Sequence, residues 1–141
     1  MEHVPPNPVG LYEPFTNHGG IVFLSAISSA EDGQLITGKV GAGVDFDTAR
    51  AAAERAAKNL LAVLLDAAGG DPRKIVRLLM VRGHVNATHD FARVHKVIDA
   101  ASELLISELG QKGRHARTAI GCATLPNNNC VTLEAIAVVS A

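Results

Sequence analysis

The alternation of apolar and polar positions along the chain predicts several strands around two helices. The strand patterns fall at residues 12–16, 21–26, 75–85, 117–124 and 131–139. Residues 17–20 predict a turn, and residues 125–130 predict the link of a hairpin between the last two strands. Residues 28–43 predict loops around a short strand at 34–37.

Apolar residues at three- and four-residue steps predict two amphipathic helices. The first runs over residues 49–68, with Asp45 or Asp47 as its cap and the glycine pair 69–70 at its end. The second follows a candidate cap at Asp90. The order of these elements predicts one α+β domain over residues 1–141, in which a mixed sheet carries both helices on one face.

Composition narrows the classes of function. The chain has 141 residues, 48% of them hydrophobic and 19% charged, which is typical of one folded domain and excludes a disordered chain. A formal net charge of −1 gives no basis for electrostatic binding of nucleic acid or of an anionic membrane. The chain lacks a signal-peptide pattern and a run of about 20 apolar residues, so we expect a cytoplasmic protein.

Neither a metal nor a cofactor is expected from the sequence. Cys122 and Cys130 lack the spacing of a zinc site, and the chain has no phosphate- or dinucleotide-binding glycine pattern. The two cysteines could meet across the predicted hairpin or remain buried thiols in a reducing compartment. Ser25 lacks the G-x-S-x-G context of a hydrolase nucleophile.

The last two strands carry the candidate chemistry. A hairpin that pairs residue 124 with residue 131 places Arg117, Ala119, Gly121 and Glu134 together on the sheet face away from the helices. The helix-facing side would then hold Ile120, Cys122, Leu133, Ala135 and Ala137.

On that predicted face, Arg117 and Glu134 stand about 13 Å apart along the strand direction. The small residues between them leave a hollow for a small carboxylate and a water molecule. The planar fork of an arginine binds two carboxylate oxygens, and a glutamate can orient and deprotonate the water. The alternative is an ordinary solvated arginine and glutamate on a sheet surface.

Two residues outside these strands are weaker candidates. Tyr12, the only tyrosine, is either a ligand-binding hydroxyl or a packing residue with its hydroxyl at the rim. His95, in the second helix, is either a proton donor or a flank residue that faces solvent or another subunit.

The closing strands resemble a known family. Residues 117–126, R-T-A-I-G-C-A-T-L-P, followed by L-E-A-I-A at 133–137, resemble the closing signature of the RidA/YjgF family. Gly10-Leu11-Tyr12 looks like the family's Gly-Pro-Tyr, and residues 22–25 look like its second strand. Residues 47–69 resemble its first helix, which ends in Ala-Ala-Gly.

The resemblance implies a chorismate-mutase-like fold and a homotrimer with clefts between subunits. It also implies hydrolysis of reactive 2-imino acids to 2-oxo acids and ammonia. By the same match, Arg117 would grip the substrate carboxylate, Glu134 would position the attacking water, and Tyr12 would be the cleft tyrosine. Ala119 matches a cysteine beside the substrate, so its main chain would be the relevant part.

The chain departs from the family pattern around the cleft. Ser25-Ala26 stands where the family has Ser-Gly, and the helix asparagine near the cleft is replaced in the region of His95. The family cysteine is Ala119, and the loop before Glu134 is two residues longer.

The leading hypothesis is an imine or enamine deaminase that acts on a small carboxylate-bearing metabolite. One alternative is a non-catalytic carboxylate-binding trimer. The other is an endoribonuclease, which the charge balance and the scarcity of stacking aromatics argue against. A homotrimer is also expected because apolar residues on the predicted open face need cover, namely Ala119, Ala123, Ile136 and Val138.

Overall fold

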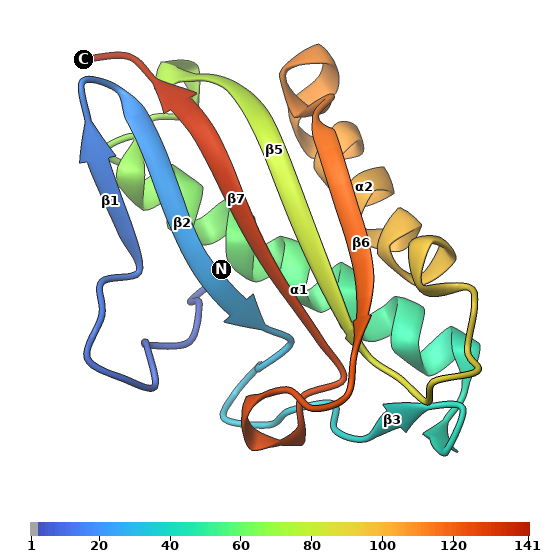
Figure 1. Ribbon diagram of the computed structural model, residues 1–141. Helices are drawn as coiled ribbons and strands as arrows, with labels where there is room; N and C mark the ends of the chain where they lie inside the picture. The colour runs from blue at the N-terminus through green and yellow to red at the C-terminus, as the bar shows by residue number, and fades with distance from the viewer. Residues whose placement is uncertain (1–2) are drawn as a thin grey trace.

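The computed structural model describes residues 3–141 as a sheet covered on one face by two helices (Figure 1). In chain order the elements are β1 (Phe15–His18), β2 (Ile21–Ser28), β3 (Lys39–Val40), β4 (Gly43–Val44), α1 (Phe46–Ala67), β5 (Ile75–Asn86), α2 (Val94–Leu109), β6 (Ala116–Cys122) and β7 (Val131–Val139). The main sheet has the order β1-β2-β7-β5-β6, so β1 and β6 are its edges. The predicted α+β class, with both helices on one face, is confirmed.

The predicted hairpin between the last two strands is wrong. β5 lies between them, parallel to β6 and antiparallel to β7. Residues 123–130 are a long enough link to pass over one intervening strand, about 10 Å across. β5 is suited to this interior place because it is long and apolar, with Leu78, Val81 and Val85 fully buried.

Local capping signals explain the ends of α1. The Asp45 side chain accepts a hydrogen bond of 2.7 Å from the Thr48 backbone N–H. At the other end Gly69 has a φ of 69°, and the Gly70 N–H donates to the Leu65 carbonyl at 2.9 Å, which forms a Schellman motif. Both caps agree with the predicted helix.

The start of α2 was predicted less well. Asp90 does not cap the helix, which begins after Arg93 without a side-chain cap. Two strand predictions also need correction. β1 begins at Phe15, which leaves Tyr12 in the preceding loop, and residues 34–37 form isolated bridges rather than a strand.

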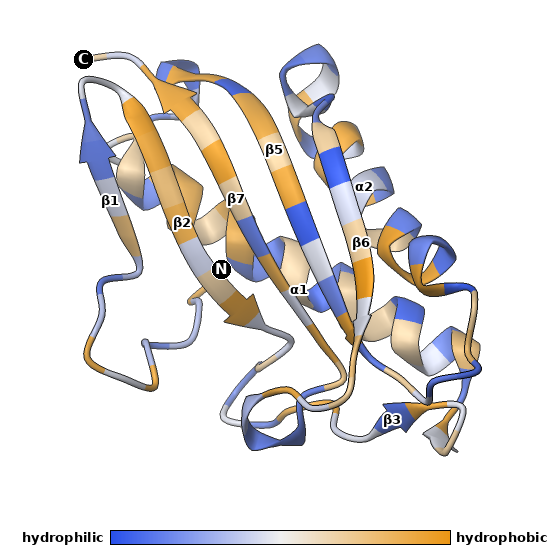
Figure 2. Ribbon diagram, viewed as in Figure 1, coloured by the Kyte–Doolittle hydropathy of each residue, from blue (hydrophilic) through white to orange (hydrophobic). Residues whose placement is uncertain are grey.

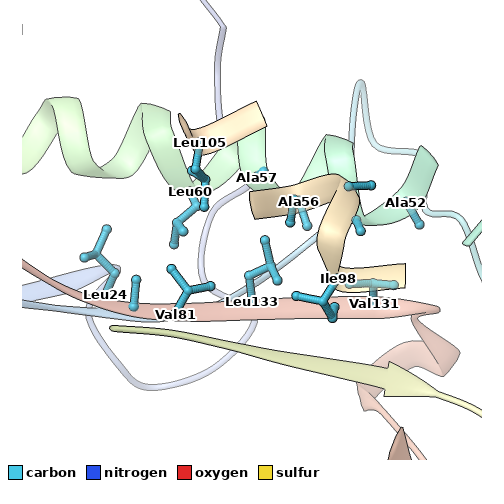
Figure 3. Close-up of a cluster of buried hydrophobic side chains, with 14 of the residues drawn as sticks. Leu24, Ala52, Ala56, Ala57, Leu60, Val81, Ile98, Leu105, Val131 and Leu133 are labelled. Carbon is cyan, nitrogen blue, oxygen red and sulfur yellow. The ribbon is translucent and has the colours of Figure 1, made fainter. Parts of the chain in front are cut away.

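Small residues let the helices approach the sheet closely. The sheet-facing side of α1 is a stripe of buried alanines followed by Leu60 (Figure 3). Leu64, one turn further on, is also buried. α2 lies over β5 at Gly83, where an added Cβ would be 2.5 Å from the Cδ1 atom of Ile98. The core is therefore built from aliphatic side chains, in agreement with the scarcity of aromatics in the sequence.

The sheet face opposite the helices is rich in apolar residues. Ile21 and Phe23 of β2 are 45% and 54% exposed, and Ile120 of β6 is 47% exposed. Figure 2 shows hydrophobic residues along β2, β5 and β7, with polar positions in the middle of β5 and β7. Within residues 3–141, neither helix is long and apolar enough to cross a membrane.

Candidate functional site

Arg117 lies on the helix side of the sheet, not on the open face as predicted. Its register partner in β5 is Val81, which in turn pairs with Ala135 of β7. Both of these residues are buried beneath the helices. Because hydrogen-bonded neighbours in a sheet share a face, Arg117 points toward α2.

The side chain of Arg117 is bound by three groups of α2. Its Nη1 donates to Asp99 Oδ1 at 2.8 Å and to Ser102 Oγ at 3.2 Å. Its Nη2 donates to the His95 carbonyl at 3.4 Å. The side chain is 23% exposed, so the guanidinium is held in place without being sealed from solvent.

Asp99 is the counterion of Arg117. The hydrogen bond from Arg117 holds the pKa of the Asp99 carboxyl below its ordinary value, although burial opposes this effect. Lys96, at 4.0 Å from Asp99, acts in the same direction. Asp99 is therefore an anion at neutral pH.

A surface hollow of about 340 Å³ opens beside the guanidinium. It is lined by Asp99, Ser102, Ile106, Arg114, His115 and Arg117. Two arginines face one aspartate there, so the charge of the lining favours an anionic ligand.

Glu134 lies on the opposite face of the sheet. It pairs in register with Arg82, and its Oε1 lies 3.8 Å from Arg82 Nη1 and 3.9 Å from His84 Nε2. The prediction that Arg117 and Glu134 share one face is therefore wrong. The physical reason is the intervening strand β5. Through Val81 it aligns Arg117 with Ala135 rather than with Glu134, so the two side chains point to opposite faces.

Three of the predicted site residues gather at the other end of the strand order. Tyr12, Ser25 and Ala26 line one hollow of about 280 Å³ beside β1 and β2. Ser25 Oγ donates to the Glu13 carbonyl at 2.7 Å, and the Tyr12 hydroxyl accepts a long bond of 3.4 Å from the Val9 N–H. The strands β2, β7 and β5 separate this hollow from Arg117 within one chain.

The remaining two candidates lie close to Arg117. Ala119 follows it on the same side of β6 and is half-buried, so its predicted place on the open face is wrong. His95 contributes its main-chain carbonyl, whereas its imidazole is exposed. The contact between α2 and Arg117 at this position is therefore independent of the His95 side chain.

The sequence interpretation missed Asp99, Ser102 and His115. Asp99 and Ser102 are three residues apart in α2 and therefore share a helix face, next to the apolar stripe of Ile98 and Leu105. His115 stands two residues before Arg117, which is the spacing of strand neighbours on one face. Neither spacing shows that these residues bind Arg117 until the position of β6 beside α2 is known.

Within the described part of the chain, no group of three or more His, Cys, Asp or Glu side chains is arranged to hold a metal ion. Cys122 and Cys130 are both free. Cys122 lies in register with Asn86 on the open side of the sheet, so its predicted place against the helices is wrong, as is that of Ile120.

The fold and its sequence define a member of a known class. Residues 4–138 match the family model described as "YjgF/chorismate_mutase-like, putative endoribonuclease". The chain belongs to this YjgF/RidA family, and the chorismate-mutase-like fold predicted from the resemblance is confirmed.

Similar proteins are found in several organisms. Protein TCP17 of Trypanosoma cruzi is 33% identical over 105 residues, which span 74% of this chain and 65% of that protein. The crystal structure of Atu1372 from Agrobacterium tumefaciens, a protein of unknown function, is 40% identical with a TM-score of 0.91, covering 96% of this chain and 87% of that one. A Shewanella oneidensis structure with the same endoribonuclease description is 26% identical with a TM-score of 0.91, covering 96% and 90%.

Proposed function

We propose that the protein hydrolyses a small reactive 2-imino or 2-enamino acid to a 2-oxo acid and ammonia. The observation that carries this proposal is that the Arg117 guanidinium is held by α2 and still has N–H donors left for a ligand. Of the five N–H donors of its guanidinium, three are used by α2, and two are left for a ligand carboxylate beside a hollow with excess positive charge. A carboxylate-bearing ligand is also bound in a protein of this fold, the Escherichia coli TdcF structure with serine.

The site requires a second copy of the chain. Arg117 belongs to one edge strand, whereas Tyr12, Ser25 and Ala26 lie at the other end of the strand order. A ring of subunits would bring the β6 edge of one chain toward the β1–β2 region of the next. We therefore propose a homotrimer with the ligand in clefts between subunits, and the exposed apolar side chains of the open face support such an assembly.

The chemistry needs no group beyond the protein and water. Glu134 would take a proton from water as the oxygen attacks the C=N carbon, which gives a carbinolamine. Glu134 gives that proton to the imine nitrogen, which completes the neutral carbinolamine. The remaining proton of the carbinolamine hydroxyl then moves to the amino nitrogen as the C–N bond breaks, so that ammonia leaves and the C=O bond of the 2-oxo acid forms. Arg117 holds the carboxylate throughout, because its two remaining donors match two oxygens.

Turnover of an imino acid tests this proposal. The imino acid is produced in situ from L-leucine by an amino-acid oxidase, and the unhydrolysed fraction is trapped with semicarbazide. We expect Glu134→Gln to lower the rate by about a hundredfold or more, which is typical of a lost general base. Glu54→Gln, an exposed change on α1, is the matched control.

Binding of the carboxylate is the second half of the test. Arg117→Lys keeps one charge and removes the fork, so we expect at least about tenfold weaker binding of pyruvate by calorimetry. The exposed Arg73→Lys change is the control. If pyruvate binds the Arg117→Lys variant as tightly as the unaltered protein, the proposal fails.

A second candidate function is a non-catalytic carboxylate-binding protein. The arrangement that favours it is Glu134, which lies beside Arg82 and His84 rather than beside the hollow of its own chain. In that case Glu134→Gln leaves pyruvate binding intact and the unaltered protein has no imino acid turnover.

Endoribonuclease activity, which the family description names, is tested by RNA degradation with a nuclease-free preparation; a net charge of −1 argues against it.

A further inference from the structure

Arg117 stands within a continuous chain of hydrogen bonds. One end is the Asp99 carboxylate, which accepts from Arg117 Nη1 at 2.8 Å. The same Nη1 donates to Ser102 Oγ at 3.2 Å, and Ser102 Oγ lies 3.0 Å from His115 Nε2. The other end is the Gly113 carbonyl, 2.5 Å from His115 Nδ1.

The direction of each hydrogen bond in this chain is fixed by its ends. The Gly113 carbonyl can only accept, so His115 Nδ1 carries a proton. In the neutral ring Nε2 then accepts from the Ser102 hydroxyl. Burial lowers the pKa of His115; the Gly113 hydrogen bond opposes this effect, and the Arg117 charge adds to it. The ring is therefore neutral at pH 7.

The neutral ring makes Ser102 an acceptor for Arg117. A serine hydroxyl can donate or accept, and without a dedicated acceptor its hydrogen is free to rotate. Because that hydrogen points to His115 Nε2, the lone pairs of Ser102 Oγ remain for Arg117 Nη1. Asp99 and Ser102 together then use both hydrogens of Nη1.

The consequence for Arg117 is a fixed orientation. An arginine side chain has many rotamers, and a fork that is already ordered loses less freedom when a ligand binds. The three groups that bind the Arg117 guanidinium all belong to α2. His115, which binds Ser102, is itself held by the Gly113 carbonyl in the turn after α2. The guanidinium is therefore held against one face of α2.

We infer that Ser102 and His115 are positioning residues that orient the guanidinium of Arg117 for a ligand carboxylate. This inference rests on the proposed function and adds the residues that set the geometry of its anchor. Ser102 acts directly on Arg117, and His115 acts through Ser102. Neither residue needs to touch the ligand.

Two matched pairs of variants separate positioning from general packing. Ser102→Ala removes the acceptor, whereas Ser102→Thr keeps a hydroxyl. His115→Asn keeps a donor at the δ position and loses the ε acceptor, whereas His115→Gln places an amide oxygen near the ε position. We expect Ser102→Ala and His115→Asn to weaken pyruvate binding about two- to tenfold, the range of one hydrogen bond, and the Thr and Gln variants to restore it.

Calorimetry with pyruvate on the full-length protein is the measurement, with thermal unfolding recorded for each variant. If Ser102→Ala and His115→Asn bind pyruvate normally while Arg117→Lys does not, this inference is wrong and the proposed function stands. Equal losses in His115→Asn and His115→Gln also contradict it, because packing would then explain both. If pyruvate binding is absent or indifferent to Arg117, the proposed function fails and the inference fails with it. The His115 pair decides the outcome if a Ser102 variant does not fold.

Discussion

Arg117 and Glu134 lie on opposite faces of one sheet, although their registers along the intervening strand β5 differ by one residue only. The main chain of β5 and the pleat of the sheet separate the two side chains within a subunit. If the two act on one ligand, as proposed, Arg117 comes from one chain and Glu134 from another.

A subunit-mixing experiment tests this arrangement. In the proposed deaminase, Arg117→Lys and Glu134→Gln chains each lose most of the imino acid turnover at low substrate concentration, and they are refolded together in equal amounts. Random mixing gives about a quarter of the clefts both native residues, so we expect about a quarter of the native imino acid turnover. Mixtures with no more activity than the separate variants would show that the pair does not meet across subunits.

The open sheet face predicts how the assembly is broken. Phe23 is 54% exposed there, and a carboxylate in its place would be buried unpaired in any contact that covers this face. We expect the unaltered protein to have the mass of three chains by light scattering, and Phe23→Glu to shift toward the 14.7 kDa of one chain. Ala51→Glu, on the exposed side of α1, is the control that leaves the trimer intact. A stable monomer of the unaltered protein at micromolar concentration would refute the trimer.

The elements that the sequence predicted well are those with local signals. α1 is bounded by Asp45 and a glycine pair, and in β7 burial alternates from Leu133 onward, with Leu133, Ala135 and Ala137 buried. Alternation says which residues share a face but not which face it is or which strand lies alongside. The positions of β6 and β5 depend on long-range packing, and the partners of Arg117 in α2 depend on β6.

Gly83 offers a test of the packing that holds α2 near β6. A Cβ there would lie 2.5 to 2.8 Å from three side-chain atoms of Ile98, so Gly83→Ala should lower the free energy of unfolding by about 1–3 kcal/mol. Gly121→Ala is the control, because its Cβ would meet Val94 at an ordinary 3.5 Å. Denaturant unfolding at one protein concentration is the measurement. We expect the Gly83→Ala/Ile98→Ala double variant to lose less than the sum of the single changes; additive losses would exclude a direct clash.

The two cysteines should differ in reactivity. Cys130 is fully buried, and burial raises its pKa to about 11, whereas Cys122 is half-buried. The thiolate is the reactive form, so at about pH 8 iodoacetamide should alkylate Cys122 and leave Cys130 intact until the protein unfolds. Peptide mass spectrometry identifies the modified residue.

We also expect Cys122→Ser to keep the imino acid turnover, and a loss of turnover in the folded variant would contradict the assignment of chemistry to Arg117 and Glu134.

The buried imidazole of His115 should make stability depend on pH. Its folded-state pKa lies below the ordinary value of 6.5, chiefly because of burial, so between these two values the unfolded chain binds more protons than the folded one. The free energy of unfolding contributed by this residue is therefore complete above pH 6.5 and is lost as pH falls toward the folded-state pKa.

The slope from one proton cannot exceed about 1.4 kcal/mol per pH unit. His115→Gln has no titrating group and keeps an acceptor for Ser102, so its stability should fall less than that of the unaltered protein between about pH 7.5 and 5.5. Denaturant unfolding at fixed protein concentration gives both curves, and the titrations of all other residues are common to them. Parallel curves would mean that His115 is not held neutral by its surroundings, which would also remove the acceptor that directs the Ser102 hydroxyl.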